Sequence, residues 1–247
     1  MIRTASPDGL RMAVASARRT VRDSGLIGPR PRLVRPAGVR ALPFDHQAVE
    51  VIQEIKGSSF VEGKLANIRL GAQRLDGVVL APGETLSFWK LVGRPTAAAG
   101  FALGRTIRGG VVGGELGGGL CQLSGIVYEA GLRAGLTPVE RHPHSRDLYE
   151  EADRFTALGL DATVVWPYKD LRLANPLPVA VQFGFVVSDT GIAASVYAPV
   201  PLAAARLDIA RTDHDGWRTV LVTRRQESGE SEAISTDRYL VPAAEAA

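Results

Sequence analysis

Apolar residues recur along this chain with the two periods that are typical of helices and of strands. Three segments have apolar positions every three to four residues, which predicts amphipathic helices over 9–22, 62–75 and 121–134. Gly77 and Gly135 follow the second and third segments, and glycine is the residue that most often ends a helix. Two of the three predicted helices therefore have a defined end.

Shorter runs of alternating or continuous apolar residues predict strands, separated by turn residues such as Asp215-Gly216 and Ser228-Gly229. The expected strands cover residues 104–113, 137–142, 160–166, 178–187, 191–198, 204–211, 217–223 and 233–241. Because short turns join consecutive strands, we expect a mostly antiparallel mixed sheet. With a few helices added, the fold class is α+β.

Charge is unevenly distributed along the 247 residues, although the net charge is only +3. Residues 1–40 contain nine arginines and two aspartates, whereas the remainder has 20 basic and 24 acidic residues. A proline-rich stretch over 28–38 is typical of a linker. We therefore expect an arginine-rich arm and linker over 1–40, a main domain over 41–200 and a C-terminal β extension over 201–247. The arm is expected to add little to the fold.

The basic arm has two interpretations. It is either a solvated surface or a segment that makes weak contact with an anionic membrane surface. The basic excess is confined to the arm, so we expect no nucleic-acid partner. The chain lacks an apolar stretch of about 20 residues and the apolar core of a secretory signal. These features predict a cytoplasmic protein, peripheral at the inner membrane surface where the arm makes contact.

The chain has a single cysteine, Cys121, which excludes an internal disulfide and any site built on paired cysteines. Seven glycines lie between residues 109 and 119, and "GGGLCQLSG" places Gly117, Gly118 and Gly119 almost directly before the thiol. Nucleotide-binding glycine motifs do not fit, because Gln122 stands where the last glycine would belong. We expect a glycine-rich loop that leads into a helix starting at the cysteine, a position that favours the thiolate. The alternative is a buried, unreactive thiol.

Two of the four histidines follow the predicted cysteine helix, in "VERHPHSRD". His142 and His144 are two residues apart, so an extended backbone would direct both to one side. A histidine here could act as the base for the Cys121 nucleophile, with Asp161 or Asp170 orienting the imidazole. The alternatives are a solvated strand end and a zinc site built from the cysteine, these histidines and an aspartate. We expect no bound metal and no diffusible cofactor.

Taken together, these segments resemble the VanW family over roughly residues 60–198. The resemblance rests on "KLAN" (64–67), "LDGVVLAPGETLSFWKLVG" (75–93), "GGGLCQLSGIVYEAGL" (117–132), "ERHPHS" (140–145), "DATVVWPYKDL" (161–171) and the Asn175 that follows. It implies a connection with the cell envelope, since the family includes an accessory protein encoded with some vancomycin-resistance clusters. Some larger members are implicated in L,D-transpeptidation of peptidoglycan, and the resemblance places their nucleophile on Cys121 and their motif histidine on His144.

The resemblance further implies a binding site for a peptide or a peptidoglycan precursor, formed by the remaining motif residues. These are Gly117, Gly118, Gly119, Gln122, Arg141, His142 and Asn175. We therefore expect a cysteine-dependent acyl transferase or hydrolase, related to L,D-transpeptidases and acting on peptidoglycan-type peptides. The main alternative is a non-catalytic module that binds a cell-wall peptide or precursor, and a zinc-dependent enzyme is a third.

Overall fold

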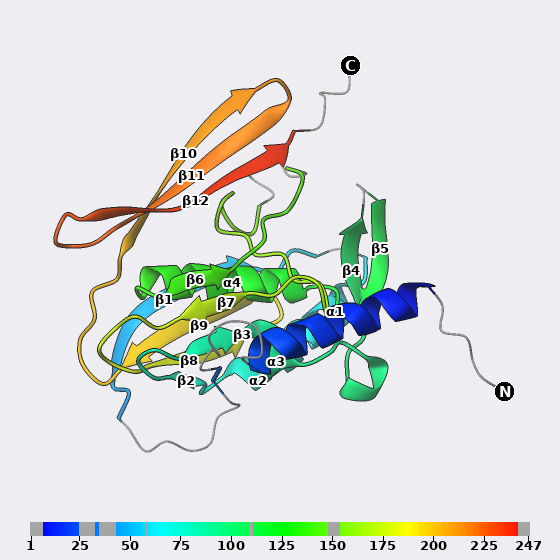
Figure 1. Ribbon diagram of the computed structural model, residues 1–247, viewed down its shortest axis with the longest axis horizontal. Helices are drawn as coiled ribbons and strands as arrows, with labels where there is room; N and C mark the ends of the chain where they lie inside the picture. Colours follow the sequence, from blue (N-terminus) through cyan, green and yellow to red (C-terminus); the bar gives the residue numbers. More distant parts are fainter. Residues whose placement is uncertain are drawn as a thin grey trace.

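The structure is a computed structural model that describes residues 7–24, 33–34, 43–57, 59–108, 111–147 and 154–241. It has the expected α+β fold, and neighbouring strands of its sheets run antiparallel (Figure 1). Much of the predicted linker, the end of the tail, Gly109 and Gly110 lie outside the described residues. The helices are α1 (Pro7–Ser24), α2 (Val61–Leu75), α3 (Phe88–Val92), the 3-10 helix η1 (Ala97–Ala99) and α4 (Leu120–Arg133).

Four sheets account for the strands, which are numbered in chain order. They are β1 (His46–Glu54), β2 (Val79–Leu80), β3 (Thr85–Ser87), β4 (Leu103–Arg108), β5 (Val111–Leu116), β6 (Thr137–Glu140), β7 (Arg172–Ala174), β8 (Val181–Val187), β9 (Gly191–Ala198), β10 (Arg206–His214), β11 (Trp217–Arg225) and β12 (Ser231–Leu240). The largest sheet has the order β1-β9-β8-β2, and the others are β3-β7-β6, the β4–β5 hairpin and β10-β11-β12. The predicted helices and most predicted strands are confirmed to within a few residues.

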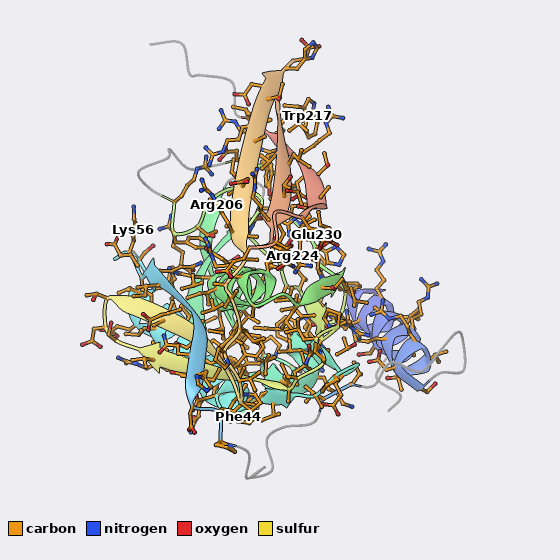
Figure 2. All side chains as sticks on the ribbon, turned by 90° about the vertical axis from the view of Figure 1, so that its left-hand side faces the viewer. Phe44, Lys56, Arg206, Trp217, Arg224 and Glu230 are labelled. Atoms are coloured by element: carbon orange, nitrogen blue, oxygen red, sulfur yellow. The ribbon has the colours of Figure 1, made fainter. Side chains whose placement is uncertain are left out.

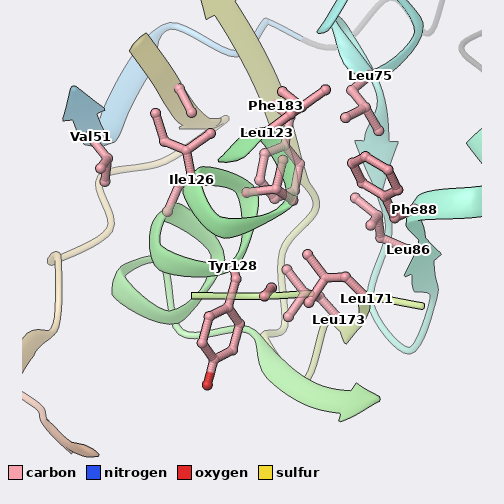
Figure 3. Close-up of a cluster of buried hydrophobic side chains, with 14 of the residues drawn as sticks. Val51, Leu75, Leu86, Phe88, Leu123, Ile126, Tyr128, Leu171, Leu173 and Phe183 are labelled. Carbon is pink, nitrogen blue, oxygen red and sulfur yellow. The ribbon is translucent and has the colours of Figure 1, made fainter. Parts of the chain in front are cut away.

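The main core lies between the four-stranded sheet and helices α2 and α4, which contact each other. Helix α4 packs against β1 and β9, and α2 packs against β8. Leu123, Ile126 and Phe183 are almost completely buried between these elements (Figure 3). Full burial of one such side chain contributes roughly 1.5–3 kcal/mol, so the α4 side chains that follow the cysteine anchor the helix firmly.

Two predicted strands differ in the structure. Residues 104–113 were expected to form one strand, but they belong to the antiparallel hairpin β4–β5, in which Leu103 pairs with Leu116. The two halves of the expected strand instead pair with each other, Thr106 with Gly113 and Ile107 with Val112. Residues 160–166 form no strand beyond an isolated bridge between Val165 and Lys169. Their backbone groups bind side chains and loop atoms instead of a neighbouring strand; for example, the Thr163 amide donates to the His142 carbonyl at 2.7 Å.

The C-terminal sheet β10-β11-β12 stands away from the body, with Trp217 at its far end and Arg224 near the body (Figures 1 and 2). The predicted turn at Asp215-Gly216 is confirmed, and both residues have positive φ values, as two-residue hairpins require. The buried Arg224 donates to the carbonyls of Leu132 and Leu136 at the end of α4, at 3.4 and 2.7 Å. The β extension is therefore fastened to the helix that carries the thiol.

Helix α1 makes contacts that the charge pattern alone did not predict. Arg19 donates to the buried Asp170 at 2.6 Å, and Asp23 accepts from Arg172 at 2.8 and 3.2 Å. Val34, from the segment expected to be a linker, is only 6% exposed and belongs to the core. The change in charge near residue 41 therefore does not coincide with the edge of the packed structure.

Candidate functional site

The thiol lies at the start of α4. The helix begins at Leu120, one residue before the cysteine, and its N-cap Gly119 has a φ of 100°, which favours glycine. Cys121 is partly buried against the core, and its Sγ lies 3.6 Å from the Val164 carbonyl oxygen. The side chain is thus neither at the centre of the core nor fully in solvent.

The first turn of α4 directs backbone amides towards the thiol end of the helix. The amides of Leu120 and Gln122 donate to the carbonyls of Gly117 and Gly119, at 3.2 and 3.0 Å. The Cys121 amide has no hydrogen-bond acceptor among the residues that the structure describes. Amides in the first helical turn carry partial positive charge and can bind an anion. The Cys121 amide can therefore donate a hydrogen bond to an anionic group placed beside the sulfur.

His144 lies between the thiol and a buried carboxylate. Its ring Nδ1 is 2.7 Å from Asp161 Oδ2, and its backbone amide donates to the same oxygen at 2.7 Å. The imidazole also interacts with the Cys121 side chain, through a hydrogen bond and through charge. The structure therefore brings together a thiol, an imidazole and a carboxylate in the order that activates a nucleophile.

Asp161 is held by a dense set of donors. Tyr239 donates its hydroxyl to Asp161 Oδ1 at 2.6 Å, and Arg141 donates to the same oxygen at 2.9 Å. Arg141 also donates to the Asp161 carbonyl at 2.7 Å, forms an ion pair with Asp237 and lies over the ring of Tyr128. With both oxygens bonded, the carboxylate has little freedom to rotate away from the imidazole.

The surroundings of His144 and Asp161 favour the charged form of each side chain. Burial lowers the pKa of His144, but the hydrogen bond that its ring donates to Asp161 and the interaction with Cys121 outweigh it and raise the pKa to about 10. Burial raises the pKa of Asp161, but the His144 hydrogen bond and the Arg141 charge outweigh it and hold the pKa well below its usual range. At neutral pH the imidazole is therefore protonated and the carboxylate ionised.

The segment 161–164 is fixed along α4 by side-chain contacts. Ser124, one turn beyond the thiol, donates to the Ala162 carbonyl at 2.5 Å, and the thiol lies against the Val164 carbonyl. Asp161 at the start of the segment is thereby placed opposite the histidine. The predicted strand is absent here because the backbone of the segment bonds to α4 on one side and to the 141–144 loop on the other, and not to a neighbouring strand.

The other chemical candidates from the sequence lie in different surroundings. His142 Nε2 is 3.3 Å from Glu140, so the two histidines have different carboxylate partners. Asp170 is 0% exposed and accepts hydrogen bonds from Ser87 at 2.6 Å, from the Trp89 amide at 3.0 Å and from other donors. Of the two aspartates left open by the sequence, Asp161 is therefore the partner of His144.

Two predicted binding residues are occupied by contacts within the fold. The buried Gln122 donates to the Glu54 carbonyl at 2.8 Å. Asn175 is 1% exposed and donates to the carbonyls of Leu80 and Val179, at 2.8 and 2.9 Å. Both amides hold neighbouring segments together in this structure.

Gly117, Gly118 and Gly119 allow the loop to pass close to its neighbours. A Cβ at Gly118 would lie 2.2 Å from the Gly104 carbonyl oxygen, and one at Gly119 would lie 2.7 Å from Lys64 Cγ. These distances leave no room for a larger residue. The glycines therefore seat the thiol loop against α2 and the β4–β5 hairpin.

In the parts of the chain that the structure describes, no group of three or more His, Cys, Asp and Glu side chains is arranged to hold a metal ion. No helix in those parts is long and apolar enough to cross a membrane.

The supporting residues Asp237 and Tyr239 were not predicted from the sequence. They lie on β12, beyond the part of the chain that carries the family-like motifs, and Tyr239 is 78 residues away from Asp161. An alternating strand pattern places them in a sheet but gives no sign of what they contact. Their role follows only from the folded arrangement.

Comparison with known proteins identifies the family. The model of the VanW like protein family matches residues 63–197, more than half of the chain. The chain is 31% identical over 139 residues to the vancomycin B-type resistance protein VanW of Enterococcus faecalis, covering 56% of this chain and 50% of that protein. It is 38% identical over 109 residues to the uncharacterized protein YoaR of Bacillus subtilis, covering 44% and 34%. The chain thus spans half or less of the curated relatives it matches, and no solved structure matches it. With the family model covering the thiol, the histidine and Asp161, the chain belongs to the VanW family.

Proposed function

We propose that this protein is a cysteine-dependent acyl transferase or hydrolase that acts on peptidoglycan-type peptides. One observation carries the proposal: the His144 imidazole is hydrogen-bonded to Asp161 and also interacts with the Cys121 side chain. The printed name of the enterococcal relative, a vancomycin resistance protein, supports a substrate from the cell envelope.

In the first step, the Cys121 thiolate attacks a peptide carbonyl and a carbon–sulfur bond forms. The carbon–nitrogen bond breaks, and the His144 imidazolium donates its proton to the leaving amine. The oxygen that becomes negative in the tetrahedral intermediate accepts a hydrogen bond from the Cys121 amide. The products of this step are a neutral thioester and a free amine.

In the second step, an acceptor amine or a water molecule attacks the thioester. His144 is now a neutral imidazole and takes the proton of the attacking group, while the carbon–sulfur bond breaks and the thiolate returns. The thioester has no charge, so the interaction that raised the pKa of His144 is weakened at this stage. This change suits the imidazole to act first as an acid and then as a base.

The competing proposal is a non-catalytic module that binds a cell-wall peptide. The partial burial of Cys121 against the core favours it. In that case the thiol would be a packing residue and the loop before α4 would hold a peptide without breaking it.

Alkylation with iodoacetamide at pH 7, followed by mass spectrometry of the native protein, separates the two. We expect rapid, stoichiometric modification of Cys121 and a rate at least about tenfold lower in His144→Gln, because the imidazolium partner of the thiolate is lost. His142→Gln is the matched control and should react within about twofold of the wild type. Incubation with a cell-wall tetrapeptide should also give a thioester on Cys121. A thiol that reacts only after unfolding would support the binding module.

A further inference from the structure

Two cationic side chains beside the thiol loop have no acidic partner within the described part of the chain. Lys64 is one turn into α2, and Arg105 lies on β4. Neither forms an ion pair with a carboxylate among the residues that the structure describes, and Arg105 Nε is buried without a hydrogen-bond partner there. Buried or half-buried cations are normally paired, so this arrangement leaves an anion to be supplied from elsewhere.

Lys64 is held directly against the loop that precedes the thiol. A Cβ built on Gly119, two residues before Cys121, would lie 2.7 Å from Lys64 Cγ and 3.1 Å from the Lys64 carbonyl oxygen. Any residue larger than glycine at position 119 would therefore collide with the aliphatic part of the Lys64 side chain, where that side chain crosses the loop. The lysine is half-buried at this crossing.

Arg105 reaches the same region from the hairpin. It pairs with Gly114 in the β4–β5 register, so the Arg105 side chain and the missing side chain of Gly114 share one face of the hairpin. On that face the ring of Phe60 would lie 3.0 Å from a Cβ at Gly114. The carbonyl of Phe60 accepts from the Lys64 amide at 3.0 Å, which brings the start of α2 to this face of the hairpin.

A hydrogen-bonded frame fixes the two cations relative to the thiol loop. Asn67 on α2 donates to the Gly118 and Ala102 carbonyls at 3.0 Å and accepts from the Ala102 amide at 2.8 Å. The carbonyl of Arg105 would lie 2.7 Å from a Cβ at Gly118. Helix α2, strand β4 and the loop are thus in direct contact.

The nearby positive charge of Arg105 also affects the pKa of Lys64. Burial and the positive charge of Arg105 both lower the pKa of Lys64. Like charges at such a site are unfavourable on their own, and a bound anion relieves their repulsion.

We infer that Lys64 and Arg105 form a binding subsite for a carboxylate of the peptide substrate, next to the bond that Cys121 attacks. The inference rests on the proposed function for the identity of the substrate, and it deepens it by naming the substrate group that is recognised. The carboxylate is either the terminal one of a short peptide or an acidic side chain near the scissile bond. The two cations hold it by charge-assisted hydrogen bonds.

Binding of small carboxylates tests the subsite without using the thiol. N-acetyl-D-alanine carries a terminal carboxylate, N-acetyl-D-isoglutamine carries a side-chain carboxylate, and N-acetyl-D-alaninamide carries none. In a chemical-shift titration of the full chain by NMR, we expect at least one of the acids to bind about tenfold more tightly than the amide. The ratio of the affinities for the acid and for the amide should fall towards one in Lys64→Gln and in Arg105→Gln. It should stay at the wild-type value in Lys90→Gln, which removes an exposed lysine on α3.

Alkylation gives a second readout at the reacting sulfur. The ratio of the rates with iodoacetate and iodoacetamide should be about tenfold higher in the wild type than in Lys64→Gln or Arg105→Gln, because only iodoacetate is anionic. If the thiol is inert to both reagents while the acids still bind selectively, the proposed function fails and the subsite stands. If acids and amide bind equally, or if the variants bind like the wild type, the subsite is overturned whatever the thiol does.

Discussion

One oxygen of Asp161, Oδ2, lies 2.7 Å from both the backbone nitrogen and the ring Nδ1 of His144. The carboxylate therefore fixes the main chain and the imidazole at once, so the ring cannot turn away without breaking a second bond. This double contact explains how a histidine with 41% of its side chain exposed keeps a defined orientation towards the thiol. It also couples the protonation of the site to the stability of the fold.

The first prediction concerns pH and stability. The pKa of His144 is raised to about 10 in the folded protein, from about 6.5 in an unfolded chain. A raised pKa means that its contribution to the free energy of unfolding is complete below about pH 6.5 and is lost as the pH rises towards 10. The free energies of unfolding of the wild type and of His144→Gln, measured in urea, should therefore converge as the pH rises from 6.5 to 10.

The control for this experiment is His214→Gln, since His214 is 83% exposed in the β10–β11 hairpin. Its unfolding free energy should follow that of the wild type across the same range. Asp161 has a lowered pKa, so its contribution is present above about pH 4 and is lost only as the solution becomes more acidic. A constant difference between wild type and His144→Gln from pH 6.5 to 10 would contradict the charged pair.

The second prediction concerns the β extension. The Tyr239 hydroxyl donates to Asp161 and accepts from the Gly159 amide at 3.0 Å, and Tyr239 is 0% exposed. Tyr239→Phe leaves the Gly159 amide without its acceptor and removes one of the two donors to Asp161 Oδ1, so it should lower the free energy of unfolding by about 1–3 kcal/mol. Alkylation of Cys121 should also slow, because Asp161 is held less firmly.

Tyr168→Phe is the matched control, since Tyr168 is 50% exposed and its hydroxyl has no described hydrogen bond. We expect its free energy of unfolding to stay within about 0.5 kcal/mol of the wild type. Equal alkylation rates in wild type and Tyr239→Phe would show that β12 plays no part in the site.

The contrast between Asp161 and Asp170 shows how far the sequence can be interpreted. The helices and most strands follow from apolar spacing, because these elements bury one face. The positions of Cys121 and His144 also follow from sequence motifs. Both aspartates, however, sit beside short apolar runs, and only the folded contacts show that one meets the imidazole while the other binds Ser87 and Arg19.

The remaining differences have the same origin. The run 160–166 has the apolar pattern of a strand, yet its backbone bonds go to Ser124 and loop groups. Tyr239 joins the site from β12, and Val34 joins the core from a proline-rich stretch. Each of these depends on contacts between segments far apart in the sequence, which local patterns do not encode.

The third prediction separates the two aspartates by experiment. Asp170→Asn removes the charge that faces Arg19 and Arg172 in a fully buried site, so it should destabilise the protein by about 3–5 kcal/mol. Under conditions where it is folded, its Cys121 should still alkylate within about threefold of the wild-type rate. Asp161→Asn should instead slow alkylation by about tenfold or more. Equal effects of the two changes on the thiol would contradict the assignment.

The fourth prediction concerns the arm. The described core cluster contains no residue of α1, so a chain lacking residues 1–24 should still unfold cooperatively. It loses Arg19 and Asp23 as partners of Asp170 and Arg172, which still pair with each other at 3.1 Å. We expect a loss of about 1–3 kcal/mol in urea unfolding. Removal of residues 1–40 also deletes Val34 and should cost more, and an equal loss in both truncations would contradict its place in the core.

The last prediction concerns an exposed side of α1 that lies next to Pro167 and Tyr168. Arg11 and Arg18 are exposed there, next to Leu10 and Val14, which are 61% and 44% exposed. An exposed helix face that combines arginines with apolar side chains is suited to the surface of an anionic bilayer, whereas Arg19 is occupied by Asp170. We therefore predict that the protein sediments with vesicles containing phosphatidylglycerol and not with vesicles of phosphatidylcholine alone. Salt at about 0.5 M should release the protein, because it screens the attraction between the arginines and the lipid headgroups.

Each of Arg11→Gln and Arg18→Gln should weaken binding about fivefold, since one arginine near such a surface contributes about 1 kcal/mol. Arg206→Gln, which removes an 81% exposed arginine from β10, is the control and should bind like the wild type. Binding that persists in high salt, or that the arm variants leave unchanged, would rule out an electrostatic contact through α1.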